Sequence, residues 1–122
     1  MRDFQKIQVW EKAHTLTLCL YKITSSFPKE ELYGLTSQIR RSAASIFANI
    51  AEGSGRNTQS ELAHFIHIAT GSASELEYHL ILARDLGYID SRTYPELKAN
   101  ITEIKRMLYG FEKTVQSHAK KV

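Results

Sequence analysis

The sequence predicts an all-α protein, an antiparallel four-helix bundle with up-down-up-down connections. Apolar residues recur at steps of three and four in four separate stretches, which is the spacing of one helix face. Proline and glycine stand between these stretches, so the connections are short, and short connections make neighbouring helices antiparallel. We expect one domain over residues 1–122, with a short lead at 1–8 and a basic tail at 117–122.

The composition fits one soluble domain. The chain has 122 residues, of which 43% are hydrophobic and 24% charged, within the usual range for a single core. Its first residues hold no apolar run typical of a signal peptide, and no stretch approaches the roughly 20 apolar residues of a membrane span. We therefore expect a cytoplasmic protein without a membrane partner. Cys19 is the only cysteine, which excludes an internal disulfide and a cysteine-based zinc cluster within one chain.

The first two predicted helices meet at a proline and a glycine. Pro28 ends the first helix, and Gly34 separates a short acidic turn from the second. Gly53 stands where a left-handed C-cap would end the second helix. The apolar face of the first helix consists of Val9, Ala13, Leu16, Leu20, Ile23 and Phe27. That of the second consists of Leu35, Ile39, Ala43, Ile46 and Ile50.

The last two predicted helices begin at capping boxes. Thr58 with Glu61 opens the third helix, Gly87 ends it, and Thr93 with Glu96 opens the fourth. The apolar face of the third helix consists of Leu62, Ile66, Ala69, Ala73, Leu76, Leu80 and Ala83. The fourth carries a heptad seam of Tyr94, Leu97, Ile101, Ile104, Leu108, Phe111 and Val115.

Two Glu-x-x-His pairs raise the hypothesis of a di-metal carboxylate site, because bundles with such sites carry that motif. The pairs are Glu11 with His14 and Glu61 with His64. At about 100° per residue, Glu11 and His14 lie roughly 130–170° from their helix's apolar face, and His64 lies about 140° from its own. Ligands of a core metal site must point inward, so we expect no metal.

Other catalytic arrangements are also disfavoured. Cys19 is expected to be half-buried with no base beside it, and the Gly-x-Ser-x-Gly nucleophile motif is missing. The segment Gly53 to Arg56 lacks the remaining residues of a phosphate-binding P-loop. We therefore predict no catalytic residue, no cofactor and no enzymatic activity.

Several apolar residues lie outside the apolar faces of their helices, and they predict self-association. Gly71 costs roughly 1 kcal/mol relative to alanine inside a helix, so we expect its small-residue patch to pack against another helix, either within the bundle or from a second subunit. Some apolar residues that lie outside the main apolar faces will complete the core. The others stay exposed, and contiguous exposed apolar surface usually marks an interface. The predicted oligomer interface consists of Trp10, Leu18, Ile68, Gly71, Tyr78 and Leu82.

The charge is modest overall but segregated. Residues 1–57 carry a net +3, residues 58–86 a net −3 and residues 87–122 a net +3. Several cations lie on one face of the last helix, and further arginines lie in the second helix and just after it. Together they predict phosphate contacts with nucleic acid. The candidate residues are Arg40, Arg41, Arg56, Lys98, Lys105, Arg106 and Lys113, with Arg41 the more outward of the adjacent pair. Alternatively, these cations form salt bridges between subunits, and the protein is a protein–protein scaffold.

Several segments resemble a known family. They are Tyr33-Gly34-Leu35, Gln38-Ile39-Arg40-Arg41, Asn49 through Gly53, and Gly71-Ser72 with Glu75. Over residues 4–115 the chain resembles the small bacterial four-helix bundle proteins encoded in intervening sequences of large-subunit ribosomal RNA genes. It is also similar to the accessory protein of diversity-generating retroelements, which works with a reverse transcriptase and nucleic acid. The resemblance implies a helical bundle, a cyclic pentamer, and RNA, DNA or a nucleic-acid-bound protein as partner.

Overall fold

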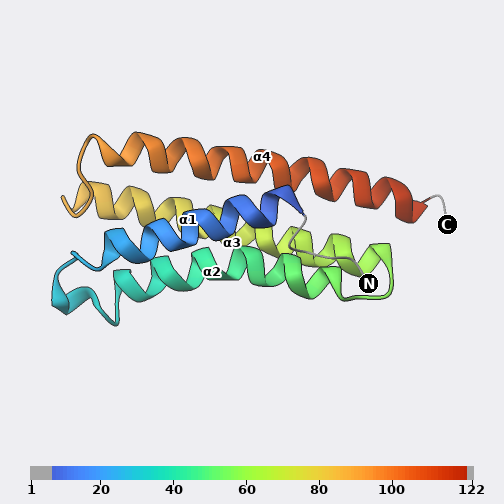
Figure 1. The fold of residues 1–122 in the computed structure, drawn as a ribbon, viewed down its shortest axis with the longest axis horizontal. Helices are drawn as coiled ribbons and strands as arrows, with labels where there is room; N and C mark the ends of the chain where they lie inside the picture. The colour runs from blue at the N-terminus through green and yellow to red at the C-terminus, as the bar shows by residue number, and fades with distance from the viewer. Residues whose placement is uncertain (1–6, 121–122) are drawn as a thin grey trace.

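The computed structural model describes residues 7–120 and contains four α-helices that lie alongside one another, each reversing the direction of the one before (Figure 1). They are α1 (Gln8–Thr24), α2 (Leu35–Ser54), α3 (Gln59–Asp85) and α4 (Thr93–Lys120), with a short 3-10 helix, η2 (Lys29–Glu31), between the first two. Residues 7–120 contain no strand. The predicted all-α, up-down-up-down bundle is confirmed.

The core consists of the predicted apolar faces. Each predicted face residue is buried except Ile23 and Phe111, which are half-buried. Consecutive helices share the largest contacts, with α2 against α3 the most extensive, while α1 against α4 closes the bundle with the smallest. Fully burying one leucine or isoleucine contributes roughly 1.5–3 kcal/mol, so the stability of the bundle depends mainly on these four seams.

Four hydroxyl side chains inside the bundle are satisfied by their own helices. Thr17 and Thr24 donate hydrogen bonds to the carbonyl oxygens of the residues four positions earlier, at 2.8 and 2.7 Å. Ser42 and Ser54 do the same at 2.7 and 2.8 Å. A buried hydroxyl that finds such a partner avoids the penalty of an unmade hydrogen bond, which explains why these residues are tolerated at core positions.

The ends of α3 match the predicted signals. The Thr58 hydroxyl accepts a hydrogen bond from the Glu61 backbone N–H at 3.1 Å, as an N-cap does. At the other end Gly87 has φ +82°, the left-handed conformation that favours glycine. The backbone N–H groups of Gly87 and Tyr88 donate to Arg84 and Ala83 carbonyls, the Schellman pattern.

Two predicted caps are wrong. The start of α4 is capped by Asp90 and not by Thr93, because the Asp90 carboxylate accepts the backbone N–H groups of Arg92 and Thr93 at 3.1 and 2.7 Å. Gly53 is not a left-handed C-cap but a buried residue inside the last turn of α2. A Cβ there would lie 2.8 Å from the Phe65 Cβ, so glycine is required by the close approach of α3.

The predicted lead and tail are only partly described. Helix α1 begins at Gln8, and residues 1–6 lie outside the described part of the chain. Helix α4 continues to Lys120, so residues 117–120 of the expected tail are helical, and residues 121–122 lie outside the described part.

Candidate functional site

The adjacent arginines Arg40 and Arg41 have different surroundings. The Arg40 guanidinium donates from Nε to the Thr24 hydroxyl at 2.9 Å and from Nη2 to the Tyr21 carbonyl at 3.3 Å. It also lies over the Tyr21 ring, 4.7 Å from the centroid. These contacts attach the end of α1 to α2, so much of the hydrogen-bonding capacity of Arg40 is used inside the bundle.

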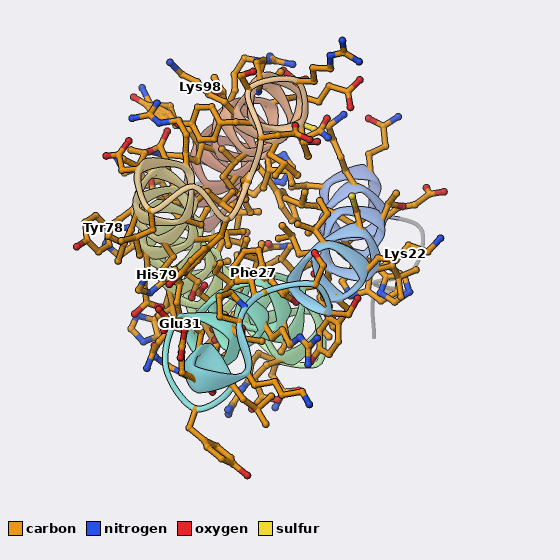
Figure 2. The ribbon with its side chains drawn as sticks, turned by 90° about the vertical axis from the view of Figure 1, so that its left-hand side faces the viewer. Lys22, Phe27, Glu31, Tyr78, His79 and Lys98 are labelled. Carbon is orange, nitrogen blue, oxygen red and sulfur yellow. The ribbon has the colours of Figure 1, made fainter. Side chains whose placement is uncertain are left out.

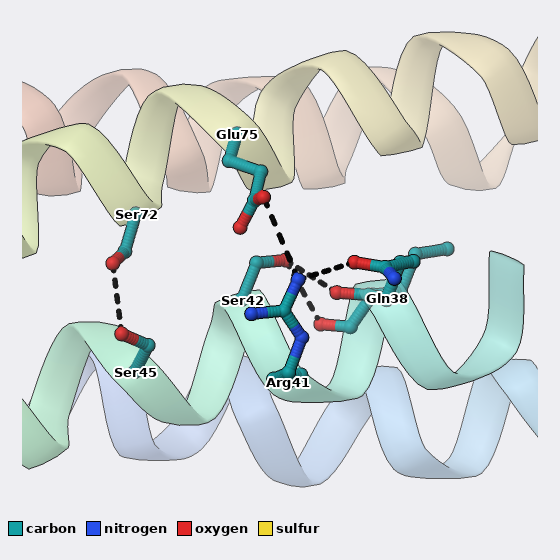
Figure 3. Close-up of polar contacts among 7 residues, drawn as sticks. Gln38, Arg41, Ser42, Ser45, Ser72 and Glu75 are labelled. Atoms are coloured by element: carbon teal, nitrogen blue, oxygen red, sulfur yellow. Dashed lines mark hydrogen bonds and ion pairs between the residues drawn. The ribbon is translucent and has the colours of Figure 1, made fainter. Parts of the chain in front are cut away.

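Arg41 is the more exposed of the pair, as predicted, with 62% of its side chain accessible. Figure 3 shows its guanidinium between Gln38, which accepts a hydrogen bond, and Glu75 of α3, whose carboxylate lies 3.7 Å away. About one turn further along α2, the hydroxyls of Ser45 and Ser72 are 2.8 Å apart. Arg41 therefore belongs to a polar row that joins α2 to α3.

His79 lies on the α2 side of α3, one turn after Glu75. Both ring nitrogens are shielded from solvent and have no hydrogen-bond partner among the described residues. Desolvation lowers the pKa of His79 from its ordinary value, the negative charge of Glu75 raises it, and the positive charge of Arg41 lowers it. The neutral imidazole is therefore favoured. The sequence gives no local signal of this shielding, because it depends on the neighbouring helix.

Arg56 pairs within the chain at the corner between α2 and α3. Its guanidinium lies 2.7 Å from the Glu52 carboxylate and 4.0 Å from that of Glu61. It also stacks over the Phe65 ring, 4.8 Å from the centroid. Arg56 therefore already has carboxylate partners inside one chain.

The predicted cationic face of α4 divides into residues with and without a carboxylate partner. The Lys105 ammonium lies 3.0 Å from the Glu77 carboxylate of α3. Arg106 donates from Nε to Glu103 at 2.9 Å, and this hydrogen bond lowers the pKa of Glu103 and raises that of Arg106. Neither Lys98 nor Lys113 has a carboxylate partner within residues 7–120, although Lys113 lies over the Tyr109 ring at 4.9 Å. Figure 2 shows Lys98 projecting outward from α4.

A groove of about 600 Å³ lies between the start of α3 and the end of α4. His67 of α3 and Glu112 of α4 meet in it, with 3.4 Å between Nδ1 and Oε2. Gln116 donates to the same carboxylate at 3.2 Å. This pair joins two helices, so no spacing within one helix indicates it. Antiparallel alignment of the apolar faces of the third and fourth helices is the signal that could have placed Glu112 opposite His67.

The outer surface of α3 carries four of the predicted interface residues. Ile68, Gly71, Tyr78 and Leu82 follow one another at steps that form a single stripe on a helix. Tyr78 is 58% exposed and points away from the bundle (Figure 2), whereas Leu82 is half-buried against the core. Outside α3 itself, no described atom lies within 4 Å of where a Gly71 Cβ would be. Of the two predicted alternatives, packing inside the bundle is excluded for Gly71 itself, although Ser72 of the same patch contacts Ser45 of α2. Contact of Gly71 with a second subunit stays a prediction.

The remaining predicted interface residues lie on α1. Trp10 is half-buried, with its ring stacked on that of His14 at 5.1 Å and edge-on to Phe47 of α2 at 5.9 Å. Leu18 is 60% exposed. His14 was expected to face solvent and is instead half-buried in this aromatic group, while Cys19 was expected to be half-buried and is exposed.

The described side chains offer no metal cluster. Among them no group of three or more histidine, cysteine, aspartate or glutamate residues is arranged to hold a metal ion. None of the helices within residues 7–120 is long and apolar enough to cross a membrane.

Comparisons with known proteins agree on the fold. The chain is similar to a crystal structure from Bacteroides thetaiotaomicron, described as a protein with unknown function from the S23 ribosomal protein family. The two are 28% identical, the match covers 86% of this chain and 95% of that one, and the TM-score is 0.77. A search of curated proteins finds no significant match. The family model for the 23S rRNA-intervening sequence protein matches residues 5–110, so the chain belongs to that family.

Proposed function

We propose that this protein is a non-enzymatic, self-associating helical bundle that binds nucleic acid, or a nucleic-acid-bound protein, through lysines of α4. The observation that carries the proposal is the row Lys98, Lys113 and Lys120. All three are exposed, and none has an ion-pair partner within residues 7–120. At about 100° per residue they fall within an arc of about 60°, and they span about 33 Å of the helix.

Two further facts support phosphate binding. Lysines act on phosphates as point charges, and such contacts supply most of the affinity of sequence-independent binding. The family takes its name from intervening sequences of 23S rRNA, which fits a role beside RNA or the nucleic acid that encodes it. Lys105, Arg106, Arg41 and Arg56 contribute less in this proposal, because each already has a carboxylate neighbour.

Self-association is proposed on the exposed apolar surface. The stripe on α3 and the α1 surface around Leu18 are two different faces of one chain. When one face of a subunit meets a different face of the next, the contact is head-to-tail, and a closing rotation generates a ring. A cyclic pentamer is the assembly that the family resemblance implies, and it would repeat the lysine row once in every subunit.

The binding test compares two triple variants of equal charge. Lys98, Lys113 and Lys120 are changed together to glutamine, and the control changes Lys12, Lys22 and Lys29 of α1 and η2 in the same way. Fluorescence anisotropy measures binding to an RNA hairpin and to duplex DNA at about 50 and 200 mM salt, the range over which phosphate contacts weaken. Three phosphate contacts per subunit predict that a plot of the logarithm of the binding constant against the logarithm of salt concentration has a slope of about −2.7 on duplex DNA. We expect the α4 variant to lose this slope and most of its affinity, while the control keeps both.

The alternative function is a protein–protein scaffold that assembles through the exposed α3 stripe and binds no nucleic acid. Changing Tyr78 to serine should reduce the oligomer mass measured by light scattering, while the same change at Tyr109, on the lysine face, should leave it intact. A parent protein that assembles but binds neither RNA nor DNA at the lower salt concentration would favour the scaffold. A parent mass equal to one 13.9 kDa chain would contradict self-association.

A further inference from the structure

The groove between α3 and α4 has the features of a ligand site. Its volume of about 600 Å³ falls within the roughly 300–1,000 Å³ of small-molecule sites. The residues that line it are Ser60, Ala63, His64, His67, Glu112, Gln116, Ala119 and Lys120. Polar groups of several kinds therefore converge on one concave surface, and Lys120 belongs both to this surface and to the exposed lysine row.

Glu112 lies at the base of the groove. Its side chain is 19% exposed, whereas the His67 side chain beside it is 74% exposed. Both polar neighbours approach the same carboxylate oxygen, since His67 Nδ1 lies 3.4 Å and Gln116 Nε2 lies 3.2 Å from Oε2. The second oxygen, Oε1, has no hydrogen-bond partner among the described residues. An ionised carboxylate accepts about four hydrogen bonds through its two oxygens, so Glu112 retains capacity for a ligand with N–H donors.

The chemistry of the groove selects among nucleobases. A carboxylate pairs best with two adjacent N–H donors. On the Watson–Crick edge of guanine, N1–H and the N2 amino group lie side by side, next to the acceptor O6. Adenine and cytosine place an acceptor nitrogen beside their amino group, and uracil places carbonyls on both sides of its single N–H. Of the four bases, only guanine therefore presents a donor pair to Glu112 and leaves an acceptor for the Gln116 amide.

We propose that this groove binds one unpaired guanine of a nucleic-acid strand whose phosphates contact Lys113 and Lys120. Glu112 accepts from guanine N1–H and N2–H, and the exposed His67 ring provides a surface on which the base stacks. Histidine is among the side chains that stack unpaired bases in RNA recognition. The inference rests on the proposed nucleic-acid binding and adds a base preference to it, because the negative charge of Glu112 repels phosphate and favours only a base with matching donors.

The test uses single-stranded hexamers of uridine that carry one central guanine or one central adenine. We expect the parent protein to bind the guanine hexamer about tenfold or more tightly, the discrimination that a bidentate pair provides. Glu112→Gln should abolish this preference and keep the affinity for the adenine hexamer. The matched control is Glu103→Gln, on the other flank of α4 beside Arg106, which should keep the preference. Thermal melting verifies that each variant folds, and His67→Ala, at an exposed site, provides a second variant that should weaken only guanine binding.

A parallel titration separates this inference from the proposed function. Guanosine, adenosine, cytidine and uridine monophosphates are added separately while NMR follows the His67 ring and the Gln116 side-chain amide. Chemical-shift changes with guanosine monophosphate alone support the guanine site in the groove. If neither hexamer binds in that case, the proposed binding through the lysine row is contradicted while the guanine site stands. Equal binding of both hexamers by the parent, with no nucleotide-specific shift, would overturn the guanine site and leave the lysine row intact. Absence of binding in both experiments would overturn both proposals.

Discussion

The two flanks of α3 differ in how they contact their neighbours. Toward α2 the inner contact is close and uncharged: Gly53 allows the helices to approach, the Ser45 and Ser72 hydroxyls pair at 2.8 Å, and the His79 nitrogens are shielded from water. Ion pairs on this flank, such as Arg41 with Glu75, involve exposed side chains. Toward α4 charged side chains make the outer contacts and a groove opens between the helices: Lys105 meets Glu77 at 3.0 Å, and His67 meets Glu112 at 3.4 Å in the groove.

This difference separates structural positions from candidate binding positions on one helix. At Gly53 and at the Ser45–Ser72 pair the helices α2 and α3 are in close contact, so substitutions there should act on stability. Between α3 and α4, His67 and Glu112 line a groove and present groups that a ligand can use. We therefore expect changes on the α2 flank to cost stability, and changes on the α4 flank to cost little stability and to alter binding.

The largest expected effect is at Gly53. A Cβ at this position would lie 2.8 Å from the Phe65 Cβ and 3.0 Å from a Leu62 methyl carbon, so α3 would have to move. We expect Gly53→Ala to lower the free energy of unfolding by about 1–3 kcal/mol, although alanine is the better helix former by roughly 1 kcal/mol. Urea denaturation provides the measurement.

Gly71 on the outer face of α3 is the matched control for Gly53. A Cβ added at this position would meet no described atom within 4 Å, so Gly71→Ala should raise the stability of the isolated subunit by up to about 1 kcal/mol. If both alanine variants are equally stable, the close contact at Gly53 does not make the α2 flank more sensitive to substitution than the open surface at Gly71.

A second, smaller effect is the pH dependence contributed by His79. Its pKa is lowered, chiefly by desolvation, from the ordinary value of 6.5, so below that pH the unfolded chain binds more protons than the folded one. The contribution of the neutral His79 ring to the free energy of unfolding is therefore fully present above pH 6.5. It is lost as the pH falls through the pKa of His79 in the folded state. The free energy of unfolding should decrease between about pH 7 and 5, with a slope below the one-proton limit of about 1.4 kcal/mol per pH unit.

His79→Phe tests the origin of that slope. Phenylalanine fills the same space without a titrating group, so the variant should lose part of the decrease between about pH 7 and 5. The carboxyl groups of Glu103 and Asp90, whose pKa values are lowered by hydrogen bonds, affect stability only at more acidic pH. A variant with an unchanged slope would show that other groups cause the acid sensitivity and that the ring is not shielded.

The core of the fold could be predicted from the sequence because burial repeats at helical spacing. Spacing along one helix is enough to predict the four apolar faces. It is also enough for the two ends of α3, the Thr58 cap and the glycine terminus at Gly87, because each depends on neighbours within one helix. Gly53 and Thr93 were misassigned because their environments depend on another element. For Gly53 that element is the approaching α3 helix, and at Thr93 the competing Asp90 carboxylate lies upstream in the turn.

The candidate site was harder to predict than the fold for the same reason. A helical wheel places Lys98, Lys105 and Lys113 on one face, but it cannot show that Glu77 of α3 meets Lys105 while Lys98 and Lys113 keep no carboxylate partner within the described residues. Adjacent Arg40 and Arg41 likewise differ because Arg40 reaches Thr24 across a helix boundary. For Lys105 and Arg40 the availability for phosphate is decided by contacts between helices, which one sequence does not encode as a local pattern. The pairs Arg56–Glu52 and Arg106–Glu103, in contrast, lie at local spacings of four and three residues.

The smallest expected effect is the ion pair between Lys105 and Glu77, whose side chains are 33% and 31% exposed. A double-mutant cycle of Lys105→Met and Glu77→Gln should give a coupling energy of about 0.2–1 kcal/mol. A parallel cycle of Ser45→Ala and Ser72→Ala should give about 0.5–1.5 kcal/mol, the usual net value of a hydrogen bond. The decisive measurement is salt dependence, because about 1 M salt shortens the screening length to about 3 Å. We expect the coupling on the α4 flank to shrink at this salt concentration and the serine coupling on the α2 flank to persist. If instead the lysine coupling survives and exceeds the serine coupling, the α4 flank is as dry and rigid as the α2 flank, and the groove beside it is not open to a base.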